Sequence, residues 1–360
     1  MRGIRWLVLG CVVLAFAADV VRADLAADLA ALLRKGLYDE VILQASNQIE
    51  RTEEPDKALL YLRGQAAFRI GRFALAAADL GQLGDYKPWD KWTPASEYAA
   101  RVAEMLRLCP RLVHEITQRG GVVFRVYFEE DHPWAAAIMA TLPEAYTRVC
   151  QFYGVTLAET PVFIFSTGPR YNAFYRAFSG GRPPTGWQWA TGGGGLLMFC
   201  QHDVDGTQPA ATGSDYFRAA IAHEFSHCLL RRYLGAMALP PWLDEGLAML
   251  CGAFMSPGDH DNNDATIAEV LRGAGPLPIE VLSEKERFYR SDVHQTAYAI
   301  GFSMTRLLYE RIGRAGLMRL LNALRQEGDV DRALRQVCGL DSRQLHAVWV
   351  EAALARVSGR

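Results

Sequence analysis

The sequence predicts an α+β protein that is all-helical at its front and mixed at its rear. Residues 24–108 are rich in Ala and Leu at helical spacing and contain an internal repeat, which predicts helices alone. From residue 109 onward, short alternating or wholly apolar runs predict strands interspersed with helices. With 360 residues, 50% of them hydrophobic, the chain is long enough for about two domains that each bury a core.

Charge and hydropathy exclude two classes of protein. The net charge of −2 provides no positive field that would attract nucleic acid, so we expect no nucleic acid among the partners. Beyond the N-terminus, every long apolar run is broken by a charge within a few residues. A multi-pass membrane protein is therefore excluded as well.

Residues 1–23 have the pattern of a secretory signal peptide. Arg2 and Arg5 precede an apolar run from residue 6 to residue 18, and small or β-branched residues lead to Ala23. The run would span only about 20 Å as a helix, which is short of a bilayer core. We therefore expect cleavage before Asp24, a secreted or periplasmic protein, and no stable membrane span after cleavage. An uncleaved anchor is the alternative.

The front segment, residues 24–108, repeats with a period of 35 residues. Gly36 corresponds to Gly71, and Tyr38 corresponds to Phe73. A Gly followed by an aromatic residue at a turn lets two helices approach closely, and the segment resembles a pair of tetratricopeptide repeats. Two repeats are fewer than a free-standing solenoid needs, so we expect the segment to rest on the remainder of the chain. It is a candidate surface for a protein partner, and a generic pair of helical hairpins is the alternative.

The rear of the chain is expected to contain a mixed domain and a C-terminal helical subdomain, over residues 109–290 and 291–360. Periodicity predicts strands at 122–128, 161–166 and 194–200, and a helix around 138–149. Leucines at helical spacing after residue 290 predict further helices.

Three features of the rear bear on other kinds of site. The glycines at 192–195 are followed by a strand and by no Lys-Ser or Lys-Thr pair, so a nucleotide site is rejected. Residues 258–264 are rich in Asp and Asn but lack the distal Glu of a helix-loop-helix calcium site, so a solvated loop is favoured. Six cysteines follow residue 23, and both disulfides and free buried thiols remain open.

The strongest chemical signal is the motif His-Glu-x-x-His at residues 223–227. Positions four apart share one face of a helix, so the imidazoles of His223 and His227 can reach one zinc ion. Glu224 borders the same face and can hydrogen-bond a water molecule without binding the metal. A buried helix with two core histidines is the alternative.

A catalytic zinc needs a third protein ligand, and the sequence offers Glu245. A helix that ends near Gly235 and turns through Pro241 would return antiparallel and bring this carboxylate beside the histidines.

The two motifs together resemble the gluzincin zinc peptidases, in particular the peptidase MA-like group related to the zinc aminopeptidases. The second motif is Trp-Leu-x-Glu-Gly-Leu-Ala at residues 242–248. The resemblance covers roughly residues 120–325. It implies a zincin-like fold, with a small sheet, the motif helix and C-terminal helices that complete the site. It also implies one Zn²⁺ ion, with His223, His227 and Glu245 as ligands and Glu224 as general base.

The resemblance further implies a tyrosine hydroxyl at the oxyanion, from a helix later in the chain. Tyr298 matches that position, and His294, one turn earlier, is a competing donor; ordinary helix packing is the alternative role for Tyr298. The chain departs from relatives in two ways. Met249 stands where thermolysin-type enzymes carry an Asp that orients a zinc ligand, and the Gly-x-Met-Glu-Asn-type segment that binds a substrate amine is absent, with residues 195–200 in its place.

The resulting expectation is an exported zinc metallopeptidase that hydrolyses peptide bonds of a peptide or protein substrate. Glu224 would take a proton from a water whose pKa zinc lowers, and Tyr298 or His294 would steady the oxyanion. An endopeptidase is favoured over an aminopeptidase, because the strand at 196–201 carries no acid for an α-amine and an edge strand there could pair with a peptide backbone. The alternatives are a binding protein with structural zinc and a zinc hydrolase of other amides or esters.

Overall fold

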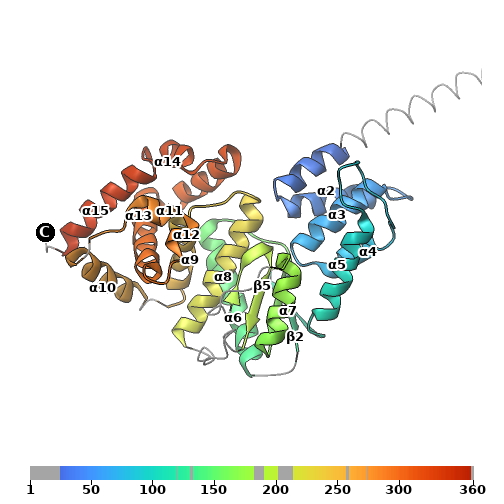
Figure 1. Cartoon of the computed structure of the whole chain (residues 1–360), viewed down its shortest axis with the longest axis horizontal. Helices are drawn as coiled ribbons and strands as arrows, with labels where there is room; N and C mark the ends of the chain where they lie inside the picture. The colour runs from blue at the N-terminus through green and yellow to red at the C-terminus, as the bar shows by residue number, and fades with distance from the viewer. Residues whose placement is uncertain are drawn as a thin grey trace, which may run out of the picture. The chain divides into compact units, whose positions relative to one another are not determined.

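The structure is a computed structural model that describes residues 25–118, 120–129, 133–181, 190–201, 214–256, 259–273 and 275–357. The signal peptide predicted at residues 1–23 lies outside the described residues. The chain divides into a front unit that ends at Arg107 and a rear unit that begins at Leu108 (Figure 1). No helix in the described ranges is long and apolar enough to cross a membrane.

The front unit consists of helices joined by turns, with a longer connection over residues 81–94. Residues 25–34 are helical, and the helices that follow are α2 (Tyr38–Ile49), α3 (Lys57–Arg69), α4 (Phe73–Leu80) and α5 (Ala95–Leu108). The unit buries Ala, Leu and aromatic side chains between these helices, among them Tyr61 and Phe68 of α3. This matches the prediction of an all-helical front.

The 35-residue repeat is visible in the backbone of the front unit. Gly36 and Gly71 have positive φ angles of 73° and 77°, which glycine adopts without a steric penalty. The residues that follow them, Leu37 and Arg72, have φ/ψ angles of −82°/61° and −81°/62°. The same turn therefore precedes α2 and α4. The resemblance to tetratricopeptide repeats stays a prediction.

The rear unit is built on a small mixed sheet. Its strands are β1 (Leu112–Gln118), β2 (Gly121–Phe128), β3 (Thr160–Phe165), β4 (Ala190–Thr191) and β5 (Leu197–Cys200), in the order β1-β2-β3-β5-β4. The central strands β2, β3 and β5 are parallel, and both outer strands are antiparallel to their neighbours. The strands predicted near 122 and 161 are confirmed, whereas the one predicted at 194–200 begins only at Leu197, after a turn of 3-10 helix at Gly193–Gly195.

Ten helices of the described chain surround this sheet or follow it. They are α6 (Pro133–Tyr153), α7 (Gly168–Ser179), α8 (Asp215–Leu234), α9 (Pro241–Ala253), α10 (Asp259–Arg272), α11 (Ile279–Ser283), α12 (Lys285–Phe288), α13 (His294–Glu327), α14 (Val330–Cys338) and α15 (Ser342–Val357). One continuous apolar core runs from β2 and α6 through α8, α9 and α13 to α15. A mostly helical chain with a small mixed sheet agrees with the predicted α+β class.

Two expectations about the rear unit are settled by the structure. The solvated loop expected at 258–264 is wrong, because α10 begins at Asp259. Asp and Asn also favour the first turn of a helix, and the buried Ile267 follows at a position that faces the core. Of the disulfides and free thiols that the sequence left open, the structure has free thiols at all six cysteines after residue 23.

Candidate metal centre and active site

The hairpin of α8 and α9 brings the two sequence motifs together. Gly235 ends α8 with a φ of 70°, and α9 begins at Pro241, whose fixed φ suits the first position of a helix. The two helices run antiparallel, because Gly252 at the end of α9 lies against Ala219 near the start of α8, while Asp244 at the start of α9 lies against His227. This is the hairpin that the motif spacing predicts.

Three ligand atoms converge between these helices. Nε2 of His223 and Nε2 of His227 are 3.1 Å apart, and Oε2 of Glu245 lies 3.2 Å from the first and 3.4 Å from the second. Ligands that surround a zinc ion tetrahedrally at about 2.0–2.1 Å lie about 3.3–3.4 Å from one another. Oε2 of Glu245 is buried and has no hydrogen-bond partner among the described residues. The His-His-Glu group therefore fits a metal ion.

Asp244 fixes the orientation of one of these histidines. Its Oδ1 lies 3.1 Å from Nδ1 of His227 and can accept the Nδ1 proton, which turns Nε2 of that ring toward the group. One turn after Glu245, where thermolysin-type enzymes carry such a carboxylate, the chain has Met249. The role of Asp244, which directly precedes Glu245 in the same motif, was not predicted from the sequence.

The negative charge around the histidines is large. Burial by itself lowers the pKa of His227, but the charges of Asp244 and Glu245 outweigh it and raise that pKa well above its usual value. Burial likewise raises the pKa of Glu245, but the facing histidines lower it well below its usual range. The carboxylate is therefore ionised, and a field of this sign favours a cation.

The carboxylate of Glu224 is held by a backbone N–H group at the end of the sheet. The backbone N–H of Gly192, just after β4, donates to Oε2 of Glu224 at 2.5 Å. A Cβ atom at Gly192 would overlap the backbone oxygen of Glu224, so only glycine permits this approach. From the sequence, Gly192 was considered only as part of a phosphate loop, which was rejected, so its contact with Glu224 was not predicted.

Two tyrosines that follow α9 in the chain, Tyr289 and Tyr298, lie close to the carboxylate of Glu245. The hydroxyl of Tyr289 donates to Oε1 of Glu245, and the rings of Tyr289 and Tyr298 meet edge to face at 6.2 Å between centroids. Burial, then the charges of Glu245 and Glu224, raise the pKa of Tyr298 far above its usual value, so its hydroxyl keeps its proton. Tyr298 thus lies near both carboxylates. Nδ1 of His294, by contrast, contacts the backbone oxygen of Ser291 at 3.1 Å. Sequence reasoning missed Tyr289.

Two glycines allow α13 to carry Tyr298 this close. A Cβ at Gly246 would lie 2.5 Å from the backbone oxygen of Gly301 and would also overlap the Thr305 side chain. A Cβ at Gly301 would lie 3.0 Å from the backbone oxygen of Trp242. The backbones of α9 and α13 are therefore in direct contact, one turn beyond Tyr298.

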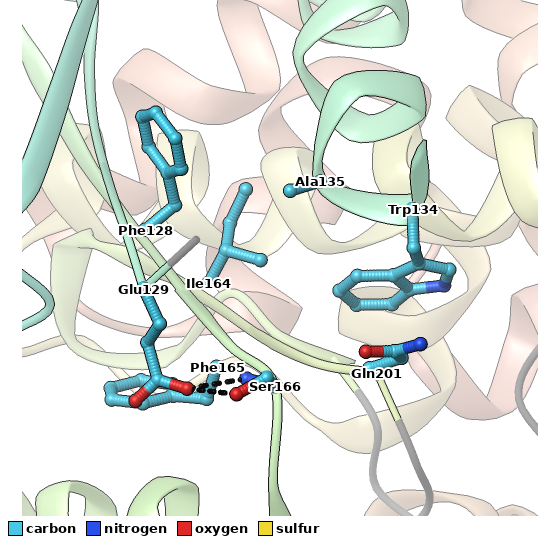
Figure 2. Close-up of a pocket in the computed structure, with 8 residues that line it drawn as sticks. All are labelled: Phe128, Glu129, Trp134, Ala135, Ile164, Phe165, Ser166 and Gln201. Atoms are coloured by element: carbon cyan, nitrogen blue, oxygen red, sulfur yellow. Dashed lines mark hydrogen bonds between the residues drawn. The ribbon is translucent and has the colours of Figure 1, made fainter. Parts of the chain in front are cut away.

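A separate hollow lies at the C-terminal ends of β2, β3 and β5 (Figure 2). Its lining residues are Phe128, Glu129, Trp134, Ala135, Ile164, Phe165, Ser166 and Gln201, and none belongs to the His-His-Glu group. Its carboxylate is already engaged, because Glu129 accepts from the backbone N–H of Ser166 at 2.8 Å and from the Ser166 hydroxyl, and pairs with Arg170 at 2.6 Å. Glu129 therefore ties the end of β3 to the first turn of α7.

Comparison with known protein families finds a similarity in the part of the chain that carries this site. Residues 188–355 match the family model of the Peptidase MA superfamily. The matched stretch contains α8, α9 and α13, which carry His223, Glu224, His227, Glu245 and Tyr298. The match supports a peptidase MA-like domain with a metallopeptidase type of function, and this superfamily is typically metal-dependent. A search of curated proteins finds no match to the chain.

Proposed function

We propose that the protein is an exported zinc-dependent metallopeptidase of the gluzincin type. The observation that carries the proposal is the convergence of Nε2 of His223, Nε2 of His227 and the unpartnered Oε2 of Glu245 within 3.1–3.4 Å. Two imidazoles and one carboxylate are the ligand set of many catalytic zinc sites, which keep a further position open. The match of residues 188–355 to the Peptidase MA superfamily supports the same assignment.

The surrounding residues are placed for the hydrolysis of a peptide bond. His223, His227 and Glu245 would hold the ion, which when bound supplies a Lewis acid that polarises a carbonyl group and lowers the pKa of water. Glu224, fixed by Gly192, would accept the proton of the attacking water and pass it to the leaving amine. The Tyr298 hydroxyl, which keeps its proton, would donate to the developing oxyanion.

The intact base also separates this proposal from a binding protein with structural zinc. Such a site has no need of a carboxylate held beside the metal group by a dedicated backbone contact. The experiment is to incubate wild type, Glu224→Gln and His223→Ala with a mixed peptide library and follow products by mass spectrometry. Wild type should cleave, Glu224→Gln should bind zinc without cleaving, and His223→Ala should lose both properties. A library left intact beside cleaved ester or amide probes would favour a non-peptide hydrolase.

Within this proposal we favour an endopeptidase over an aminopeptidase. The segment at 196–201 was expected at the sheet edge, but β5 lies between β3 and β4. Residues 190–201 contain no acidic side chain to hold an α-amine. Cleavage should therefore survive N-acetylation of a substrate peptide; its loss on acetylation would show an aminopeptidase.

Export and partner binding rest on the sequence patterns. We propose that residues 1–23 are removed, so that the mature chain begins at Asp24 in a secreted or periplasmic protein. Mass spectrometry of the native protein checks this, and an intact N-terminus would favour an anchor. The tetratricopeptide-like front is proposed as a surface for a protein partner.

A further inference from the structure

The two oxygens of Glu245 have different environments. Oε2 faces Nε2 of both histidines and has no hydrogen-bond partner among the described residues, whereas Oε1 accepts the hydroxyl of Tyr289. Glu245 is only 5% exposed, so little water is available to replace that donor. A buried carboxylate whose second oxygen lost its partner would be costly. Tyr289 therefore both satisfies Oε1 and fixes which oxygen faces the histidines.

The position of Tyr289 is itself fixed by packing. It follows α12 directly, and its neighbour Phe288 is fully buried in the core. The ring of Tyr289 meets Phe288 at 5.1 Å and Tyr298 at 6.2 Å, both edge to face. The two ring contacts that hold Tyr289 thus come from residues outside α8 and α9, the helices that supply the three ligand atoms.

From this geometry we propose that Tyr289 is a positioning residue that holds Glu245 as a one-oxygen ligand and thereby sets the affinity of the site for zinc. The proposal rests on the proposed function, because it takes the His-His-Glu group to be the zinc site. It assigns separate tasks to two adjacent tyrosines. Tyr289 acts on the ligand, whereas Tyr298 acts on the reaction.

The test compares Tyr289→Phe with Tyr298→Phe, its matched control. Each change removes one hydroxyl and keeps the ring and its edge-to-face packing. The zinc dissociation constant is measured by competition with a chromophoric chelator, and kcat is measured on a cleaved peptide. Loss of a partner that orients a metal ligand typically costs about 10–100-fold in affinity, which we expect for Tyr289→Phe. Tyr298→Phe should lose less affinity than Tyr289→Phe and should lose kcat.

Several outcomes would overturn the proposal. Wild-type affinity in Tyr289→Phe would remove Tyr289 from any role at the metal, and an equal loss in both variants would reduce it to general packing. A wild-type protein that binds no zinc would overturn the proposed function with it, and that result is visible before any variant is made.

A second measurement does not depend on the folding of a variant. X-ray absorption at the zinc edge of the wild-type protein should show a single carboxylate oxygen at about 2.0–2.2 Å. Two oxygens at equal distance would mean that Oε1 has left Tyr289, and would contradict the proposal directly.

Discussion

Replacing Gly246 by Ala should destabilise the rear unit, although alanine is the better helix former. The new Cβ would lie 2.5 Å from the backbone oxygen of Gly301 and would overlap the Thr305 side chain. A backbone oxygen cannot rotate away, so α9 and α13 must separate. Overpacking costs about 1–3 kcal/mol, and this contact belongs at the upper end. The higher helix propensity of alanine offsets about 1 kcal/mol of this cost. The free energy of unfolding should therefore fall by about 2 kcal/mol.

The assay is thermal unfolding followed by circular dichroism, with Gly252→Ala as the matched control. For a unit of this size, about 2 kcal/mol corresponds to a melting temperature lower by about 4–8 °C. Gly252 lies on the same helix and gains the same propensity, but its Cβ would lie 3.1 Å from the backbone oxygen of Ala219, which a small shift relieves. It should melt within about 4 °C of wild type, as about 1 kcal/mol implies. If Gly246→Ala melts at or above wild type, the close contact of α9 with α13 is not what requires glycine.

Three further predictions concern the metal and the base. Asp244→Ala should weaken zinc binding about 10–100-fold in a chelator competition, because His227 loses the partner that orients it; unchanged affinity would contradict that role. Elemental analysis should find one zinc per chain in wild type and in Glu224→Gln but none in Glu245→Ala, and full zinc in Glu245→Ala would exclude it as a ligand. Glu224→Gln should also lose about 10²–10⁴-fold in kcat, and a smaller loss would mean that another group takes the proton.

The sequence predicted the metal group because its signal is local. The four-residue spacing of His223 and His227 requires only that their segment be helical, and Glu245 needs one further turn between helices. Asp244 was missed for a different reason. Asp244, just before the ligand Glu245, and Met249, four positions after it, can both border the neighbouring helix. The packing of α8 on α9 decides which of the two does, and that packing is a tertiary property.

Other parts of the fold left weak traces in the sequence. β4 is two residues long and β1 is mostly exposed, so neither shows the alternation that identifies a half-buried strand. Tyr289 lies in the turn between the short helix α12 and the long helix α13, where no periodicity marks a buried hydroxyl. Gly192 was noted in the sequence, but its role depends on the close approach of the sheet to α8. Residues distant in sequence determine that approach.

Gly192 also sets a lower limit on what a transplanted version of this site would need. A designer who grafted the His-Glu-x-x-His helix and its partner α9 onto a helical bundle would reproduce the three ligand atoms, because both helices come as one hairpin. The graft would lack the backbone N–H that holds Glu224, since that donor belongs to Gly192, just after β4, where the backbone lies against the helix without a side chain between them. Such a graft should bind metal more weakly, because it also lacks Tyr289, and should turn over poorly, so a faithful miniature has to include the end of the sheet.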